Sequence, residues 1–82
     1  MDVKIKSVKP QDDFILEAEF VDGTVKRYDV KPLFEEIEDF KQLKEQPELF
    51  QAPEIVCCGD GVAWGDNLDV ACEEIWENGI TV

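Results

Sequence analysis

The chain has 82 residues, with 20 Asp or Glu against 8 Lys or Arg and no histidine, so its formal net charge is −12. Apolar residues make up 44% of the sequence, which is enough for one small hydrophobic core and argues against intrinsic disorder. We expect residues 1–82 to form a single domain. With one serine, no histidine and no phosphate-binding loop, the composition points to none of the common catalytic classes.

The acidic residues are concentrated in the second part of the chain. Residues 1–31 hold six basic and seven acidic side chains, whereas residues 32–82 hold two basic and thirteen acidic ones. Such a surface repels phosphate backbones, so we expect no direct binding of nucleic acid. The same charge would attract a basic protein partner.

Residues 1–10 lack the apolar core of a signal peptide, and no run of residues has the length and hydrophobicity of a membrane span. A cytoplasmic location is therefore predicted. The odd number of cysteines fits a reducing compartment. Cys72 is expected to be a small buried residue, and one of Cys57 and Cys58 is expected to face the core from a strand. Without histidine or a Cys-x-x-Cys pair, we predict no zinc site and no cofactor.

The first third of the chain predicts three strands. Residues 3–8 indicate a short first strand, followed by a turn at residues 10–13. Residues 14–20 alternate apolar and polar side chains, which is typical of a half-buried strand. The pair Asp22-Gly23 then predicts a hairpin turn, and residues 24–30 form the returning antiparallel strand.

Two registers are open for this hairpin. A two-residue loop would pair Glu19 with Lys26 and turn Arg27 toward the core. A three-residue loop with a glycine bulge would instead pair Leu16 with Tyr28. We favour the bulged register, because its buried face is then Phe14, Leu16, Ala18, Phe20, Tyr28 and Val30.

Pro32 is well placed in the first turn of a helix, and Glu35 and Glu36 near that terminus suit the helix dipole. Apolar residues at helical spacing predict that this segment covers the sheet with Leu33, Ile37 and Phe40. A second short turn at residues 41–45 would end at Pro47.

Two further strands are expected at residues 54–58 and 62–64, joined by a turn at residues 59–61. Asp69 is a natural N-cap for a last helix over residues 70–77, which would end at Asn78-Gly79. The resulting order is β-β-β-α-β-β-α. It predicts an α+β domain with a mainly antiparallel sheet of about five strands and helices on one face.

Several motifs recur in a fixed order along nearly the whole chain. They are Phe20, Asp22 and Gly23; Asp29, Val30, Pro32 and Leu33; Phe40, Leu43 and Phe50; and Gly61, Trp64, Asn67, Leu68 and Asp69. In this order they resemble a widespread family of small bacterial domains of unknown function. Members of that family stand alone or are fused to a helix-turn-helix domain, and some are encoded beside toxin-like proteins. The resemblance implies an antitoxin-like or accessory role and no established activity.

We therefore expect a non-catalytic interaction or regulatory module whose partner is a basic protein. The predicted interaction surface consists of Trp64, Asp66, Asn67, Glu35, Glu36, Glu38 and Asp39. A homodimer anchored by an exposed Trp76 or Phe34 is the rival interpretation. A further alternative is an acidic decoy that competes with nucleic acid for a basic protein.

An enzyme centred on residues 64–69 is the alternative of a different class. Asp66 and Asp69 beside Trp64 could act as an acid/base pair. A turn at Asp66, a helix cap at Asp69 and packing of Trp64 near Trp76 explain the same residues, so we expect no catalytic residue. The spacing of Asp60, Asp66 and Asp69 does not fit a calcium loop, and we expect no metal.

Overall fold

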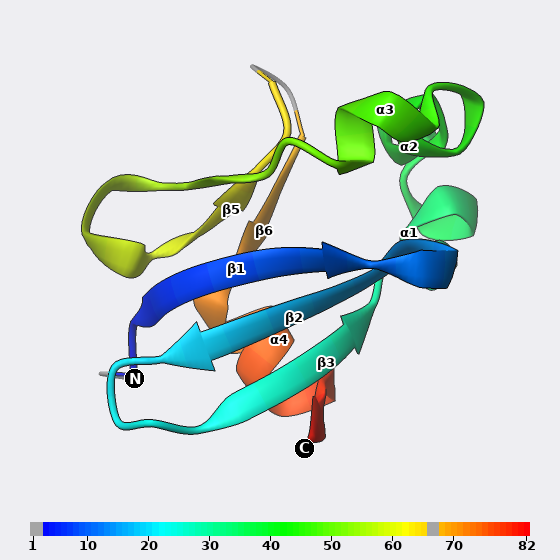
Figure 1. Cartoon of the computed structure of the whole chain (residues 1–82). Helices are drawn as coiled ribbons and strands as arrows, with labels where there is room; N and C mark the ends of the chain where they lie inside the picture. Colours follow the sequence, from blue (N-terminus) through cyan, green and yellow to red (C-terminus); the bar gives the residue numbers. More distant parts are fainter. Residues whose placement is uncertain (1–2, 66–67) are drawn as a thin grey trace.

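The computed structural model describes residues 3–65 and 68–82. Within this part of the chain there are two antiparallel sheets, one with the strand order β1-β2-β3-β7 and one with the order β4-β5-β6 (Figure 1). The strands are β1 (Ile5–Gln11), β2 (Ile15–Phe20), β3 (Val25–Asp29), β4 (Glu54–Ile55), β5 (Gly61–Ala63), β6 (Asp69–Ala71) and β7 (Ile80–Thr81). The helices are α1 (Lys31–Glu36), α2 (Lys41–Glu45), α3 (Pro47–Phe50) and α4 (Cys72–Asn78). The predicted α+β class is confirmed.

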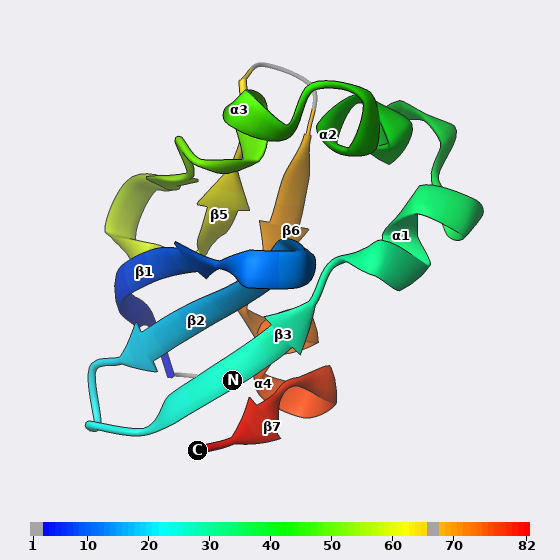
Figure 2. The same cartoon turned by 45° about the vertical axis from the view of Figure 1, so that its right-hand side comes forward.

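The strand count and the layering differ from the prediction of about five strands with helices on one face. Among the described residues there are seven strands in two sheets. Helix α4 lies behind β2 and β3, while α1 follows the end of β3 and leads to α2 and α3, which lie near the upper ends of β5 and β6 (Figure 2). Strand β7 was not predicted, because two residues are too few to show a period. It pairs with β3 through Lys26 and Arg27.

The β2–β3 hairpin has the bulged register. Leu16 pairs with Tyr28, and the amide of Val30 donates a hydrogen bond of 3.1 Å to the carbonyl of Phe14. Gly23 has φ 93°, the left-handed conformation that a glycine bulge requires. The expected face is buried, except that Phe14 is half-buried and belongs to a 3₁₀ turn (Asp12–Phe14) between β1 and β2.

The helical region is interrupted at Ile37. There the backbone is extended, with φ −129° and ψ 110°, and the side chain is 45% exposed. The expectation that Ile37 shares a buried helical face with Leu33 and Phe40 is therefore wrong. A 3₁₀ turn (Glu38–Phe40) follows, and residues 41–45, which were expected to form a short turn, form helix α2.

Cys57 and Cys58 lie in a 3₁₀ turn (Cys57–Gly59), and both are exposed. The predicted strand over residues 54–58 is thus too long, because β4 ends at Ile55 and the chain turns at Cys57–Gly59, where Cys58 and Gly59 adopt positive φ values of 65° and 80°. The expectation that one of these two cysteines faces the core is wrong. Instead the turn packs against the start of β1, where a Cβ on Gly59 would lie 2.6 Å from the carbonyl oxygen of Ile5.

Asp69 is not a helix cap. It begins β6, which pairs with β5 through Val70 and Val62, and α4 begins only at Cys72. The end of this helix is as expected, with the amide of Gly79 donating a hydrogen bond of 2.9 Å to Ile75. Cys72 is buried, as predicted.

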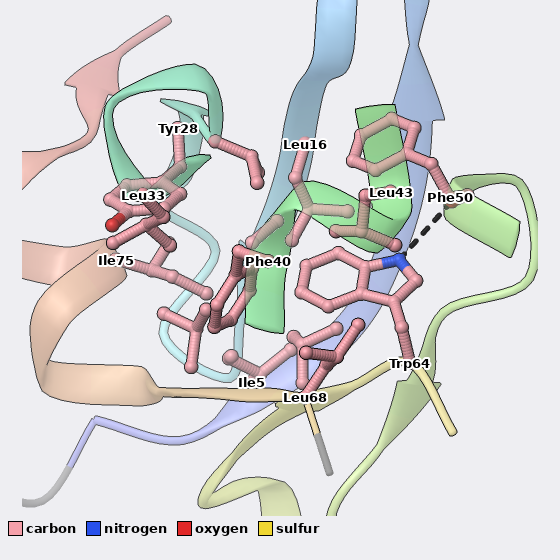
Figure 3. Packing of buried hydrophobic residues seen from close by; sticks show 14 of the residues in the cluster. Ile5, Leu16, Tyr28, Leu33, Phe40, Leu43, Phe50, Trp64, Leu68 and Ile75 are labelled. Atoms are coloured by element: carbon pink, nitrogen blue, oxygen red, sulfur yellow. Dashed lines mark hydrogen bonds between the residues drawn. The ribbon is translucent and has the colours of Figure 1, made fainter. Parts of the chain in front are cut away.

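The core lies between the two sheets and the helices, and its centre is aromatic (Figure 3). Trp64, which follows β5, is 1% exposed and stacks on Phe50 with ring centroids 5.7 Å apart. Trp76 packs instead against Phe20, at 5.0 Å, so the two tryptophans occupy different parts of the molecule. No helix of the described part has the length and apolar character needed to cross a bilayer.

Candidate functional site

A groove of about 460 Å³ lies between the α1 segment and the junction of β6 with α4. It is lined by Leu33, Glu36, Ile37, Phe40, Asp69, Val70, Ala71 and Glu74, and we call this set the acidic groove. A second hollow beside it is lined by Tyr28, Asp29, Pro32, Glu36, Glu74 and Asn78. Because Glu36 and Glu74 belong to both, the two hollows form one continuous surface.

Local backbone geometry places the groove residues. The chain leaves the helical conformation at Ile37, which puts an exposed apolar side chain on the rim between Glu36 and the following 3₁₀ turn. On the opposite wall, the alternation of β6 buries Val70 and exposes Asp69 and Ala71. The groove therefore combines an apolar base with carboxylates on both walls.

The charge of the groove is uniformly negative. Its ionisable residues are Glu36, Asp69 and Glu74, and none of its lining residues is basic. The Tyr28 hydroxyl donates a hydrogen bond of 2.9 Å to Oε2 of Glu74. Burial, and then the hydrogen bond to Glu74 and its charge, raise the pKa of the Tyr28 phenol well above its ordinary value. Tyr28 thus stays neutral and acts as a fixed donor at the groove's edge.

Ion pairing is concentrated in the first half of the chain. Among the described residues the pairs are Lys4–Asp60, Lys6–Glu19, Arg27–Glu17, Lys31–Asp13 and Lys31–Asp29. Asp60 is the one acidic residue from the second half in this set. Within the described residues, the three groove carboxylates therefore have no cationic partner.

Comparison with family models gives a match over residues 5–81 to a family described as a protein of unknown function (DUF2442). The chain belongs to this family. The resemblance inferred from the motifs is thereby confirmed, and every residue of the acidic groove falls within the matched range. Comparison with curated proteins and with solved structures gives no match. Membership of DUF2442 assigns no activity, so the functional argument depends on the geometry of the groove.

In this DUF2442 chain, Glu35, Glu36, Glu38 and Asp39 are exposed on α1 and the turn after it, as an interaction surface requires. Glu36 also lines the acidic groove. Asp66 and Asn67, the other polar residues of the predicted surface, lie outside the described residues.

The aromatic residues proposed for docking are less accessible than expected. The structure places Trp64 in the core instead of at a partner-facing surface. Phe34, a proposed dimer anchor, is 6% exposed and packs edge-on against Phe14. Trp76 is half-buried and lies under the Lys26 ammonium, 4.7 Å from it.

Sequence reasoning missed the wall of the groove formed by Asp69, Ala71 and Glu74. Interpreting Asp69 as a cap made Val70 part of a helix, which hid the strand. A usable signal was present, since Leu68, Val70 and Cys72 alternate with polar or small residues at the period of a strand. All three side chains are buried.

Proposed function

We propose that this DUF2442 protein is a non-catalytic interaction module that regulates a basic protein partner, and that the partner docks at the acidic groove. The observation that carries the proposal is a set of three carboxylates, Glu36, Asp69 and Glu74, which have no cationic partner among the described residues. They line the groove together with the exposed apolar side chain of Ile37. That combination suits a binding surface better than a solvated surface that serves solubility alone.

The chemistry of the groove matches a long basic side chain. The aliphatic stem of an arginine or lysine can lie against Ile37, while its charged head reaches the carboxylates of Glu36 and Glu74. Charge-assisted hydrogen bonds of this kind are about twice as strong as neutral ones. Moreover, the excess of acidic residues in residues 32–82 would speed the encounter with a basic partner.

The regulation we propose is antitoxin-like, which means that the module inhibits its partner by binding to it. A partner that acts on nucleic acid must carry a basic surface, and an acidic module that covers this surface would block it. The resemblance to domains encoded beside toxin-like proteins supports this form of regulation.

The test is co-purification of the tagged chain from its own cells, compared between two charge-reversal variants. In Glu36→Lys/Asp69→Lys both substitutions fall in the groove, and both residues are exposed. The matched control Glu48→Lys/Glu54→Lys changes the net charge equally at exposed positions outside the groove. We expect a stoichiometric basic protein with the wild type and the control, released as ionic strength rises, and none with the groove variant.

Three results would contradict the proposal. One is a partner that binds the groove variant as strongly as the wild type, and another is binding that does not depend on ionic strength. The third is a stable homodimer in light scattering with no other stoichiometric protein, which would favour self-association.

A further inference from the structure

Cys57 and Cys58 form a pair of thiols that the groove does not involve. Both side chains are exposed, and their sulfur atoms lie 3.1 Å apart. The third cysteine, Cys72, is 1% exposed, and its thiol is directed to the carboxylate of Glu73 at 3.3 Å. The chain therefore has one accessible dithiol and one sequestered thiol.

The turn, and not the sequence spacing alone, brings the two sulfur atoms together. Adjacent residues of a strand point to opposite faces of a sheet. Here Cys58 has φ 65° and ψ 13°, so the chain reverses between the two side chains. The reversal is held by hydrogen bonds of 2.9 Å from the Gly59 amide to Val56 and from the Val56 amide to Gly61.

We propose that Cys57 and Cys58 form a reversible dithiol–disulfide site that exchanges with low-molecular-weight disulfides. In the first step one thiolate of the pair attacks a sulfur of the small disulfide, which forms a mixed disulfide and expels one thiolate. In the second step the neighbouring thiolate attacks the protein sulfur of that mixed disulfide and expels the second small thiolate. The two cysteines lose two electrons and two protons in total, and the small disulfide is reduced to two thiols.

The distance favours a disulfide over a metal site. Closing the bond requires the sulfur atoms to approach by about 1 Å, from 3.1 Å to the length of an S–S bond. Two thiolates on a tetrahedral zinc ion would instead lie roughly 3.8 Å apart and would need two more ligands. Among the described residues, no group of three or more cysteine or carboxylate side chains is arranged to hold a metal ion.

The surroundings restrict the exchange to this pair. The shared hydrogen bond with Cys57, and then the charge of Cys57, raise the pKa of the Cys58 thiol. Burial, and then Glu73, raise the pKa of the Cys72 thiol. Exchange needs an accessible thiolate, so the reaction at the exposed pair accelerates as the pH rises, whereas burial keeps Cys72 out of reach. A ring closed between adjacent residues is strained, and strained, exposed disulfides are readily reduced again.

The experiment is incubation of the full chain with oxidised glutathione at about pH 8, followed by alkylation, intact mass spectrometry and peptide mapping. We expect the wild type to lose two hydrogen atoms and gain an internal Cys57–Cys58 disulfide, which dithiothreitol reopens. Cys57→Ser and Cys58→Ser should each stop as a mixed disulfide with one glutathione, because the resolving thiol is missing. Cys72→Ser should behave as the wild type does.

Other products would overturn the proposal. These are a wild type that remains unreacted, one that stops with bound glutathione, and one in which Cys72 joins the disulfide. Circular dichroism checks that each variant is folded, and the exposure of Cys57 and Cys58 leads us to expect that serine is tolerated at both positions.

Discussion

The indole nitrogen of Trp64 donates a hydrogen bond of 3.2 Å to the backbone carbonyl of Phe50, and the two rings stack with an interplanar angle of 17° (Figure 3). This contact joins the end of β5 to α3, and therefore joins the three-stranded sheet to the helices. Phe40 packs edge-on against the same indole at 6.3 Å. Trp64 is thus central to the packing of the domain.

Trp64→Phe should lower the free energy of unfolding by about 2–4 kcal/mol, because it leaves the Phe50 carbonyl without its donor and opens a small cavity. Trp76→Phe is the control. Trp76 is half-buried and contributes edge-on packing with Phe20 and a cation–π contact, so we expect a loss of about 1 kcal/mol. Urea unfolding followed by circular dichroism measures both. Equal losses would show that the hydrogen bond to Phe50 adds little.

Gly59→Ala should be more destabilising than Gly23→Ala. Both glycines have positive φ, 80° and 93°, so an alanine is strained by about 1 kcal/mol at either position. A Cβ at Gly23 meets no atom within 4 Å, whereas one at Gly59 would lie 2.6 Å from the Ile5 carbonyl oxygen. We expect an additional loss of about 1–3 kcal/mol for Gly59→Ala, measured by urea unfolding. Equal values would mean that β1 and the turn can separate without cost.

The elements with a long periodic pattern could be predicted from the sequence, whereas the short ones could not. The β2–β3 hairpin could be predicted, including its register, because a charged side chain on a buried face excludes the other pairing. Strand β6 was missed despite the alternation of Leu68, Val70 and Cys72, because a helix begins at Cys72, only three residues after Asp69, and makes Asp69 resemble a helix cap. Local preference was overridden there by pairing with β5.

The candidate site was predicted only in part, for a similar reason. The exposed acids of α1 follow from composition and helical position alone. The groove, however, depends on the break at Ile37 and on the approach of β6 to α1, and both are tertiary features. Trp64 was placed at the surface because it lies among polar residues in the sequence, while its burial depends on Phe40 and Phe50, which are distant in the sequence.

The stability of the domain should fall in alkali through Tyr28. Its pKa is raised in the folded protein, so the neutral phenol is favoured by folding. The contribution of Tyr28 to the free energy of unfolding is fully present below about pH 10, which is the pKa of the phenol in the unfolded chain. It is lost as the pH rises further. Tyr28→Phe should cost about 1–2 kcal/mol at neutral pH, because Glu74 loses a hydrogen-bond donor. Above about pH 10.5 the wild type should lose stability more steeply than the variant. Parallel pH profiles from urea unfolding would contradict this role.

Ile37→Ala should leave the free energy of unfolding within about 0.5 kcal/mol of the wild type, because the side chain is 45% exposed at the rim of the acidic groove. Leu43→Ala is the comparison, since Leu43 is fully buried and its truncation should cost about 2–4 kcal/mol. A continuous helix from Lys31 would bury both residues and give two large losses. A large loss at Ile37 would therefore place it in the core and remove the apolar surface on which a basic side chain is proposed to lie.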